Sequence, residues 1–174
     1  AYSIIKNHDG YIGVESEVGV GTKFYLYLPA SAERRQVGMN LKEAPASGKG
    51  RILIKDDEEI VREFLGEVLD QLGYEVELTK DGAEAIDLYR RAKENNRAFD
   101  AVIMDLTVPT GMGGKEIVIR LLEIDDKVKV IASSGYSNDS VMSDFKKYGF
   151  RGAVAKPYNL EELIRALSKV LNGE

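Results

Sequence analysis

The feature that most constrains the fold is a regular alternation of strand-like and helix-like segments, which begins near residue 51 and continues to the end of the chain. Short apolar runs alternate with longer stretches whose apolar residues recur at helical spacing. Strand–helix units in series predict an α/β domain with a parallel sheet and right-handed crossovers. The expected strands are residues 51–55, 74–79, 101–104, 129–133 and 152–155, and the expected helices are residues 58–72, 81–95 with Asp81 as the cap, 114–124, 138–148 and a last helix capped by Asn159 in a variant of the capping box with Glu162.

Polar side chains with related chemistry stand at the carboxyl ends of four of these strands. Asp56 and Asp57 follow the first strand, while Asp105, Ser134 and Lys156 follow the third, fourth and fifth. Because the carboxyl ends of neighbouring parallel strands converge on one crevice, we expect these side chains to lie close together. Crowded carboxylates repel one another, and Mg²⁺, which prefers oxygen ligands, relieves that repulsion. A carboxylate can also attack phosphorus, and positive charge stabilises the transferred group. The pattern therefore predicts a site for Mg²⁺ and a phosphoryl group.

The same segments resemble the receiver domain of two-component response regulators. The matching pieces are ILIKDDEE, VIMDLTVPTGMGG, VIASSGYS and GAVAKPY, in the order and spacing of that family. The resemblance implies a doubly wound, flavodoxin-like sheet of five parallel strands in the order 2-1-3-4-5. The site residues that it implies are Asp105 as the phosphoacceptor, Asp56, Asp57, Asp105 and the backbone carbonyl of Thr107 as ligands of Mg²⁺, and Ser134 and Lys156 as contacts of the phosphoryl group.

The resemblance also implies partners and a conformational switch. The phosphoryl donor would be a histidine kinase or a histidine phosphotransfer protein. Phosphorylation would shift the domain between two conformations and change the surface of its fourth and fifth helices. The switch candidates are Ser134, Tyr136 and Ala153. Many receivers carry an aromatic residue at the position of Ala153, so this chain lacks that aromatic switch, and Tyr136 is a partial substitute.

The chain before residue 51 has a different character. Residues 30–50 are small, polar and glycine-containing, which predicts a linker between residues 1–29 and a receiver domain at residues 51–174. Within the first segment, residues 2–8 predict the end of a helix, and residues 11–17 and 22–29 predict a two-stranded hairpin. Such a hairpin is marginal in water by itself, so it needs a packing partner. Its apolar positions are Ile12 and Val14 on the first strand and Phe24, Leu26 and Leu28 on the second.

Residues 1–29 resemble the last part of a histidine-kinase ATP-binding domain. The match is IIKNHDGYIGVESEVGVGTKFYLYLP. The order of kinase end and receiver resembles a hybrid sensor histidine kinase, and a chain that opens at Ala1 within a helix is expected to be a fragment of one. We expect no functional ATP site in it. The enzymatic character of the fragment stays open: at most, it would catalyse its own phosphorylation and dephosphorylation at Asp105. A homodimer through the hairpin, or through the face of the fourth and fifth helices, is also open.

Composition excludes several classes of function. The 174 residues carry a net charge of −5 without a basic block, which argues against nucleic-acid binding. The absence of cysteine excludes disulfides and thiolate metal sites. No apolar run is long enough to cross a bilayer, so we expect no membrane contact by this fragment. A cytoplasmic location is the expectation, with a membrane anchor elsewhere in the parent protein left open.

Some residues leave alternatives open. Lys55 stands where the receiver family usually has an apolar residue, and we expect its side chain to extend to the surface. The alternative is that it leans toward the acidic pocket and weakens Mg²⁺ binding. Lys55 and Ala153 favour a second hypothesis, a docking module with little phosphotransfer. Asp56 and Asp57 by themselves are also compatible with simple helix caps. An aspartyl phosphatase is disfavoured, because such enzymes generally need a second acid where this chain has Thr107.

Overall fold

The computed structural model describes residues 2–30, 48–106, 112–135 and 140–173. The chain divides into two compact units, Ala1–Lys42 and Glu43–Glu174. Within the described ranges, no helix combines the length and the apolar character that a membrane crossing requires.

The larger unit is an α/β domain built on a parallel five-stranded sheet. Its strands lie in the order β4-β3-β5-β6-β7, and every neighbouring pair is parallel. Counted from the first strand of this unit, the order is 2-1-3-4-5, which confirms the predicted topology. The elements are β3 (Arg51–Lys55), α2 (Glu59–Gln71), β4 (Glu75–Thr79), α3 (Gly82–Glu94), β5 (Ala101–Asp105), α4 (Gly114–Ile124), β6 (Val130–Ser134), α5 (Ser140–Ser143), the 3₁₀ helix η2 (Phe145–Tyr148), β7 (Gly152–Ala155) and α6 (Leu160–Asn172).

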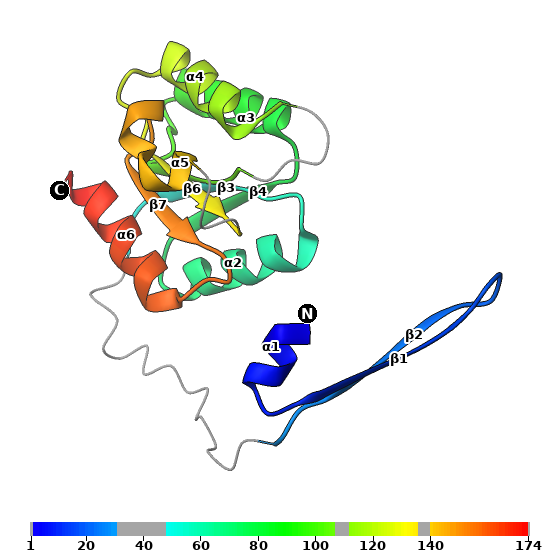
Figure 1. Cartoon of the computed structure of the whole chain (residues 1–174). Helices are drawn as coiled ribbons and strands as arrows, with labels where there is room; N and C mark the ends of the chain where they lie inside the picture. Colours follow the sequence, from blue (N-terminus) through cyan, green and yellow to red (C-terminus); the bar gives the residue numbers. More distant parts are fainter. Residues whose placement is uncertain (1, 31–47, 107–111, 136–139, 174) are drawn as a thin grey trace. The chain divides into compact units, whose positions relative to one another are not determined.

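Helices cover both faces of the sheet. Alternate residues of a strand point to opposite faces, so Leu53 packs with α3 and α4, while Ile52 and Ile54 pack with α2 and α6. Figure 1 shows these two helix layers, with α3 and α4 on one side of the strands and α2 and α6 on the other. The central strands β3, β5 and β6 are buried almost throughout, as expected for parallel strands covered on both faces.

One predicted helix is interrupted. The sequence predicts a continuous helix over residues 138–148. The described part consists of α5 and η2, separated by Asp144 with φ −136° and ψ 44°. Ser143 and Asp144 stand at this break, and short polar side chains of this kind compete with the helical hydrogen bonds of the backbone. Residues 138 and 139 lie outside the described ranges.

The predicted caps begin two helices. The Asp81 carboxylate accepts hydrogen bonds from the backbone N–H groups of Ala83 (2.7 Å) and Glu84 (3.2 Å) at the start of α3. The Asn159 side chain accepts one from the N–H of Glu161 (3.0 Å) at the start of α6. Asn159 is therefore the cap, as predicted, and the bond that it accepts comes from the residue before Glu162.

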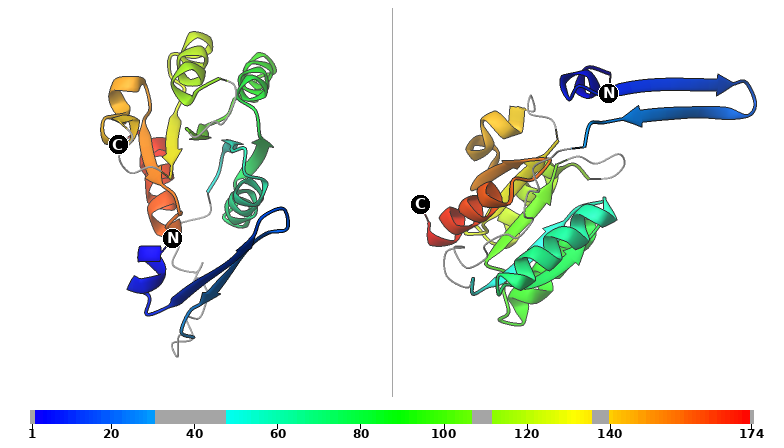
Figure 2. Two further views of the ribbon diagram at one scale, coloured as in Figure 1. Left: turned by 45° about the vertical axis from the view of Figure 1, so that its right-hand side comes forward. Right: turned by 90° about the horizontal axis from the view of Figure 1, so that it is seen from below.

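The smaller unit contains a short helix and a hairpin. Its elements are α1 (Tyr2–Asn7), β1 (Tyr11–Glu17) and β2 (Gly21–Tyr27). The strands pair antiparallel, as the blue ribbon in the right view of Figure 2 shows. The register places Ile12 opposite Leu26 and Val14 opposite Phe24, which puts these four side chains on one apolar face, as predicted. The predicted linker lies largely outside the described residues.

Candidate functional site

The carboxyl edge of the parallel sheet brings the predicted site residues together. Asp56 and Asp57 follow β3, Asp105 ends the adjacent β5, Ser134 ends β6, and Lys156 follows β7. The strands β3, β5, β6 and β7 are consecutive neighbours in the sheet, so residues far apart in sequence meet at one end of it. Asp56, Asp105 and Ser134 are each 1% exposed, so the edge is a packed site rather than an open acidic surface.

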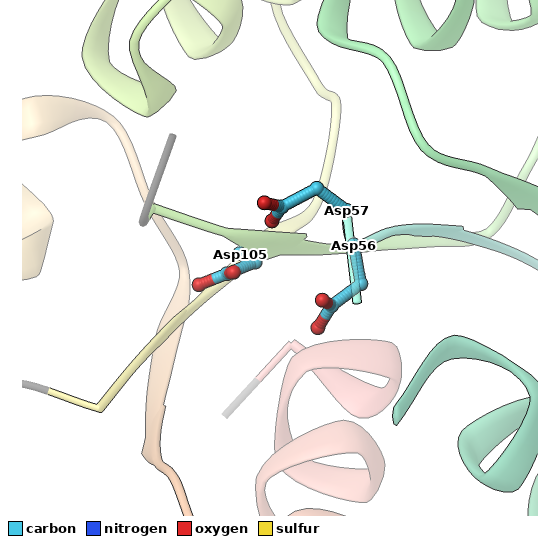
Figure 3. Close-up of side chains that lie close together, drawn as sticks. All are labelled: Asp56, Asp57 and Asp105. Carbon is cyan, nitrogen blue, oxygen red and sulfur yellow. The ribbon is translucent and has the colours of Figure 1, made fainter. Parts of the chain in front are cut away.

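Three carboxylates form the centre of this site. Asp56, Asp57 and Asp105 each offer an oxygen, and these oxygens lie within 4.8 Å of one another. Figure 3 shows the three carboxylate groups projecting into the same region from the ends of β3 and β5. Asp57 is exposed, whereas the other two are buried, so a cation can enter from the side of Asp57. Mg²⁺ is usually held by one or two carboxylates together with waters and phosphate oxygens, and this cluster is a site of that kind.

Lys156 bridges two of the carboxylates. Its Nζ lies 2.9 Å from Asp105 Oδ2, 2.8 Å from Asp56 Oδ2 and 3.3 Å from Glu58 Oε1. Burial by itself lowers the pKa of Lys156, but its hydrogen bonds and charge interactions with Asp56 and Asp105 outweigh this effect and raise the pKa above its usual value. Lys156 is therefore positively charged at neutral pH in this site.

Backbone contacts fix the position of Lys156. Its N–H donates to the carbonyl oxygen of Ser134 at 2.9 Å, which ties the end of β7 to the end of β6. The Lys156–Pro157 peptide bond is cis. The hydrogen bond to Ser134 holds Lys156 next to the strand β6.

Asp56 is held by the start of α2. Its Oδ1 accepts the backbone N–H of Glu58 at 3.0 Å, and its carbonyl oxygen accepts Arg62 Nη1 at 2.7 Å. Asp56 Oδ2 is buried and pairs with Lys156 Nζ, which lies 2.8 Å away. Lys156 offsets the negative charge of this oxygen, and a carboxylate oxygen has a further lone pair that can bind a cation. Burial raises the pKa of Asp56 above its usual value, and Lys156 offsets part of that effect.

The structure contradicts the expectation for Lys55. Its side chain does not extend to the surface: the residue is 1% exposed, and Nζ donates to the backbone carbonyl of Asp105 at 3.3 Å. The reason is the alternation along β3. Lys55 points to the same face as Leu53, and α3 and α4 cover that face.

Several contacts of the site were not predicted from the sequence. Glu58 and Arg62, which bind Lys156 and the backbone of Asp56, belong to the acidic run after β3 and to the first turns of α2. The sequence feature that could have indicated Glu58 and Arg62 is that both lie within six residues of Asp56. The Ser133 hydroxyl and Tyr158 OH lie 2.7 Å apart, and burial raises the pKa of Tyr158 to about 12. This pair joins β6 to the segment after Lys156, and no pattern in the sequence indicated it.

Three residues complete the predicted set. Ala153, in β7, is partly buried and packs against the core cluster on the side of α3 and α4. Thr107 and Tyr136 lie outside the described residues. Their roles as a metal ligand and as a switch residue therefore stay predictions.

Comparison with known proteins places this geometry in a family. The sequence model of the response regulator receiver domain matches residues 52–168. The chain is 31% identical to sporulation initiation phosphotransferase F of Bacillus subtilis over 121 residues, which cover 70% of this chain and 93% of that protein. It is 29% identical to sensor kinase CckA of Brucella abortus over 182 residues, which cover 99% of this chain and 19% of that protein. The chain thus spans about a fifth of the length of the sensor kinase.

A solved structure supports the same relationship. The fold resembles that in the CheX-CheY-BeF₃-Mg²⁺ complex from Borrelia burgdorferi with a TM-score of 0.62 and 25% sequence identity. The similarity covers 69% of this chain and 87% of that one. That complex contains BeF₃ and Mg²⁺.

Proposed function

Because the chain belongs to the response regulator receiver family, we propose that Asp105 accepts a phosphoryl group in a site where Asp56, Asp57 and Asp105 bind Mg²⁺. The observation that carries this proposal is the position of the Lys156 ammonium, 2.9 Å from Asp105 Oδ2, inside a cluster of three carboxylates. The backbone carbonyl of Thr107 is the proposed protein ligand that completes the metal site.

The proposed reaction transfers a phosphoryl group between two nucleophiles. A carboxylate oxygen of Asp105 forms a bond to phosphorus, and the bond between phosphorus and the donor nitrogen of a phosphohistidine breaks, which leaves an acyl phosphate and a histidine. Bound Mg²⁺ supplies positive charge to the phosphoryl oxygens. Lys156 and Ser134 hold two of these oxygens. Attack by water on phosphorus later releases inorganic phosphate and restores the Asp105 carboxylate.

The proposed partners follow from this chemistry. The donor is a histidine kinase or a histidine phosphotransfer protein, and the responsive surface surrounds α5, η2 and α6. The smaller unit is proposed to be the end of a kinase ATP-binding domain, so that the parent protein is a hybrid sensor kinase. The alignment with sensor kinase CckA over 99% of this chain supports that origin. A homodimer through the hairpin is the corresponding proposal for the chain by itself.

A docking module with little phosphotransfer is the second candidate function. The observation that favours it is Lys55, whose ammonium binds the main chain of the proposed phosphoacceptor. A receiver with a weakened metal site would still fold and bind partners. Labelling kinetics in the presence and absence of Mg²⁺ separate the two functions.

The first prediction is that Asp105→Asn abolishes phosphorylation. Acetyl phosphate with Mg²⁺ should add one phosphoryl group to the wild-type chain, detected by intact-protein mass spectrometry, and none to Asp105→Asn, because the amide is a poor nucleophile. The matched control is Asp70→Asn, an exposed aspartate of α2, which should label like wild type. Full labelling of Asp105→Asn at another residue would contradict the proposed function.

A further inference from the structure

One lysine of the larger unit is buried at a place where the proposed chemistry does not require it. Lys55 is 1% exposed, and its Nζ donates to the backbone carbonyl oxygen of Asp105 at 3.3 Å. Buried ammonium groups normally pair with a carboxylate, because an isolated buried charge is costly. Among the described residues, none of the salt bridges involves Lys55. Its hydrogen bond to a neutral carbonyl leaves the charge largely uncompensated at short range.

The position of Lys55 gives Asp105 a second lysine. Lys156 contacts the Asp105 carboxylate and also Asp56, which is anchored to α2. Lys55 reaches the main chain of Asp105 and points, like Leu53, to the face that α3 and α4 cover. The two ammonium groups therefore contact different parts of Asp105 at the end of β5. One contacts the group that would be phosphorylated, and the other contacts its backbone.

The second lysine changes the charge balance of the cluster. Lys156 pairs with the carboxylates of Asp56 and Asp105, and Lys55 adds a second positive charge at the main chain of Asp105, next to the three-carboxylate cluster. A fixed positive charge repels a cation and attracts an anion bound at the same place, and the buried surroundings screen it weakly. An apolar side chain of similar length would occupy the same space without the cost of burying a charge. The charge of Lys55, rather than its volume, is what distinguishes this site.

We propose that the buried charge of Lys55 weakens Mg²⁺ binding at the acidic cluster and strengthens binding of the phosphoryl anion at Asp105. The inference rests on the proposed function. It implies that this receiver needs a higher Mg²⁺ concentration to fill its metal site than the same site with an apolar residue at position 55. Once the metal is bound, the same charge favours the phosphorylated form.

The test uses ligands of opposite charge on the full chain. Mg²⁺ is titrated calorimetrically into wild type and Lys55→Met, and beryllofluoride is then titrated at saturating Mg²⁺. We expect the Mg²⁺ dissociation constant of Lys55→Met to fall about tenfold, the order expected for one nearby unit charge, and the affinity for beryllofluoride to fall at the same time. Lys80→Met removes an exposed lysine just after β4, at the same edge of the sheet, and should change both constants by less than about twofold because water screens its charge.

The opposite changes expected for Mg²⁺ affinity and beryllofluoride affinity separate an effect of charge from a distortion of the site. A distorted site would bind both ligands more weakly, and that result would overturn the inference, as would constants equal to those of wild type. Lys55→Gln keeps a hydrogen-bond donor and removes the charge, so it should reproduce Lys55→Met and takes its place if that variant does not fold. Failure of the proposed function has a different signature, namely a wild-type chain that acetyl phosphate does not label at Asp105.

Discussion

At the scale of single residues, the central feature of the site is that Lys156 pairs with two carboxylates at once. Lys156 lies within 3 Å of both Asp56 and Asp105, and its charge is needed because two buried carboxylates repel each other. Phosphorylation would convert the Asp105 carboxylate into an acyl phosphate, which changes what Lys156 can bind. Under the proposed function, the lysine then pairs with a phosphoryl oxygen and loosens its hold on Asp56. A small change of partner at one residue thereby alters the contacts between the ends of β3, β5 and β7.

Asp125 gives a residue-scale prediction on stability. This residue follows α4, and its carboxylate accepts Tyr89 OH at 3.0 Å and the N–H of Lys127 at 3.1 Å and pairs with Lys93 Nζ at 2.9 Å. Burial acts to raise the pKa of Asp125, but these three partners outweigh it and lower the pKa below its usual value. Asp125→Asn should therefore reduce the free energy of unfolding at neutral pH by about 1.5 kcal/mol, the lower end of the range for a hydrogen bond to a charged group.

The pH dependence of that loss follows from the sign of the shift. A carboxyl whose pKa is depressed in the folded state stabilises the fold above its unfolded pKa and loses this effect as pH falls through its folded pKa. The difference between wild type and Asp125→Asn in urea unfolding should thus be full at neutral pH and shrink below pH 3.8, the usual value for Asp. Asp126→Asn changes the exposed neighbour and should have little effect at any pH. A difference that stayed constant from neutral to acid pH would contradict this account.

At the scale of helices and strands, the positions of the site residues along the sheet could be predicted from the sequence, whereas the burial of individual side chains could not. The strands that carry Asp56, Asp105 and Lys156 could be predicted because buried parallel strands read as continuous apolar runs, and their carboxyl ends converge for topological reasons. The direction of Lys55 could not be predicted in the same way. Alternation tells which residues share a face with Leu53, but whether a helix closes over the end of that face depends on packing. The break at Asp144 could not be predicted either, because it depends on whether side-chain hydrogen bonds to the backbone or the packing of a short helix is more favourable.

The cap of α3 gives a prediction at the scale of one element. Asp81 Oδ1 accepts two backbone N–H groups at the start of the helix, which would otherwise lack helical partners. Asp81→Ala should lower the free energy of unfolding by about 1 kcal/mol, the usual value of an N-cap, and shift the urea midpoint without changing the slope. The comparison variant is Asp87→Ala, an exposed position within α3, where the loss should be smaller. Equal losses of unfolding free energy in Asp81→Ala and Asp87→Ala would contradict a stabilising role of the cap.

At the scale of the whole molecule, the two units differ in how well they bury their apolar residues. The sheet of the larger unit is covered by helices on both faces, and its buried core residues form two clusters. The hairpin instead exposes 60% of Val14, 62% of Phe24 and 55% of Leu26 on one face. Contiguous exposed apolar surface of this kind marks an interaction site in many proteins. In the proposed hybrid kinase, the rest of an ATP-binding domain would cover this face, and a second copy of the chain is the partner that the following experiment tests.

The last prediction concerns this apolar face. Because Phe24 lies directly opposite Val14 on this face, a charged side chain in place of Phe24 should prevent burial of the face against another molecule. We expect the wild-type chain to show concentration-dependent self-association in sedimentation velocity and Phe24→Lys to remain a monomer over the same concentrations. The matched control is Tyr25→Lys, which places the same charge one residue later in β2, on the opposite face, and should associate like wild type. A wild-type chain that stays monomeric throughout, or equal association of the two variants, would contradict pairing through this face.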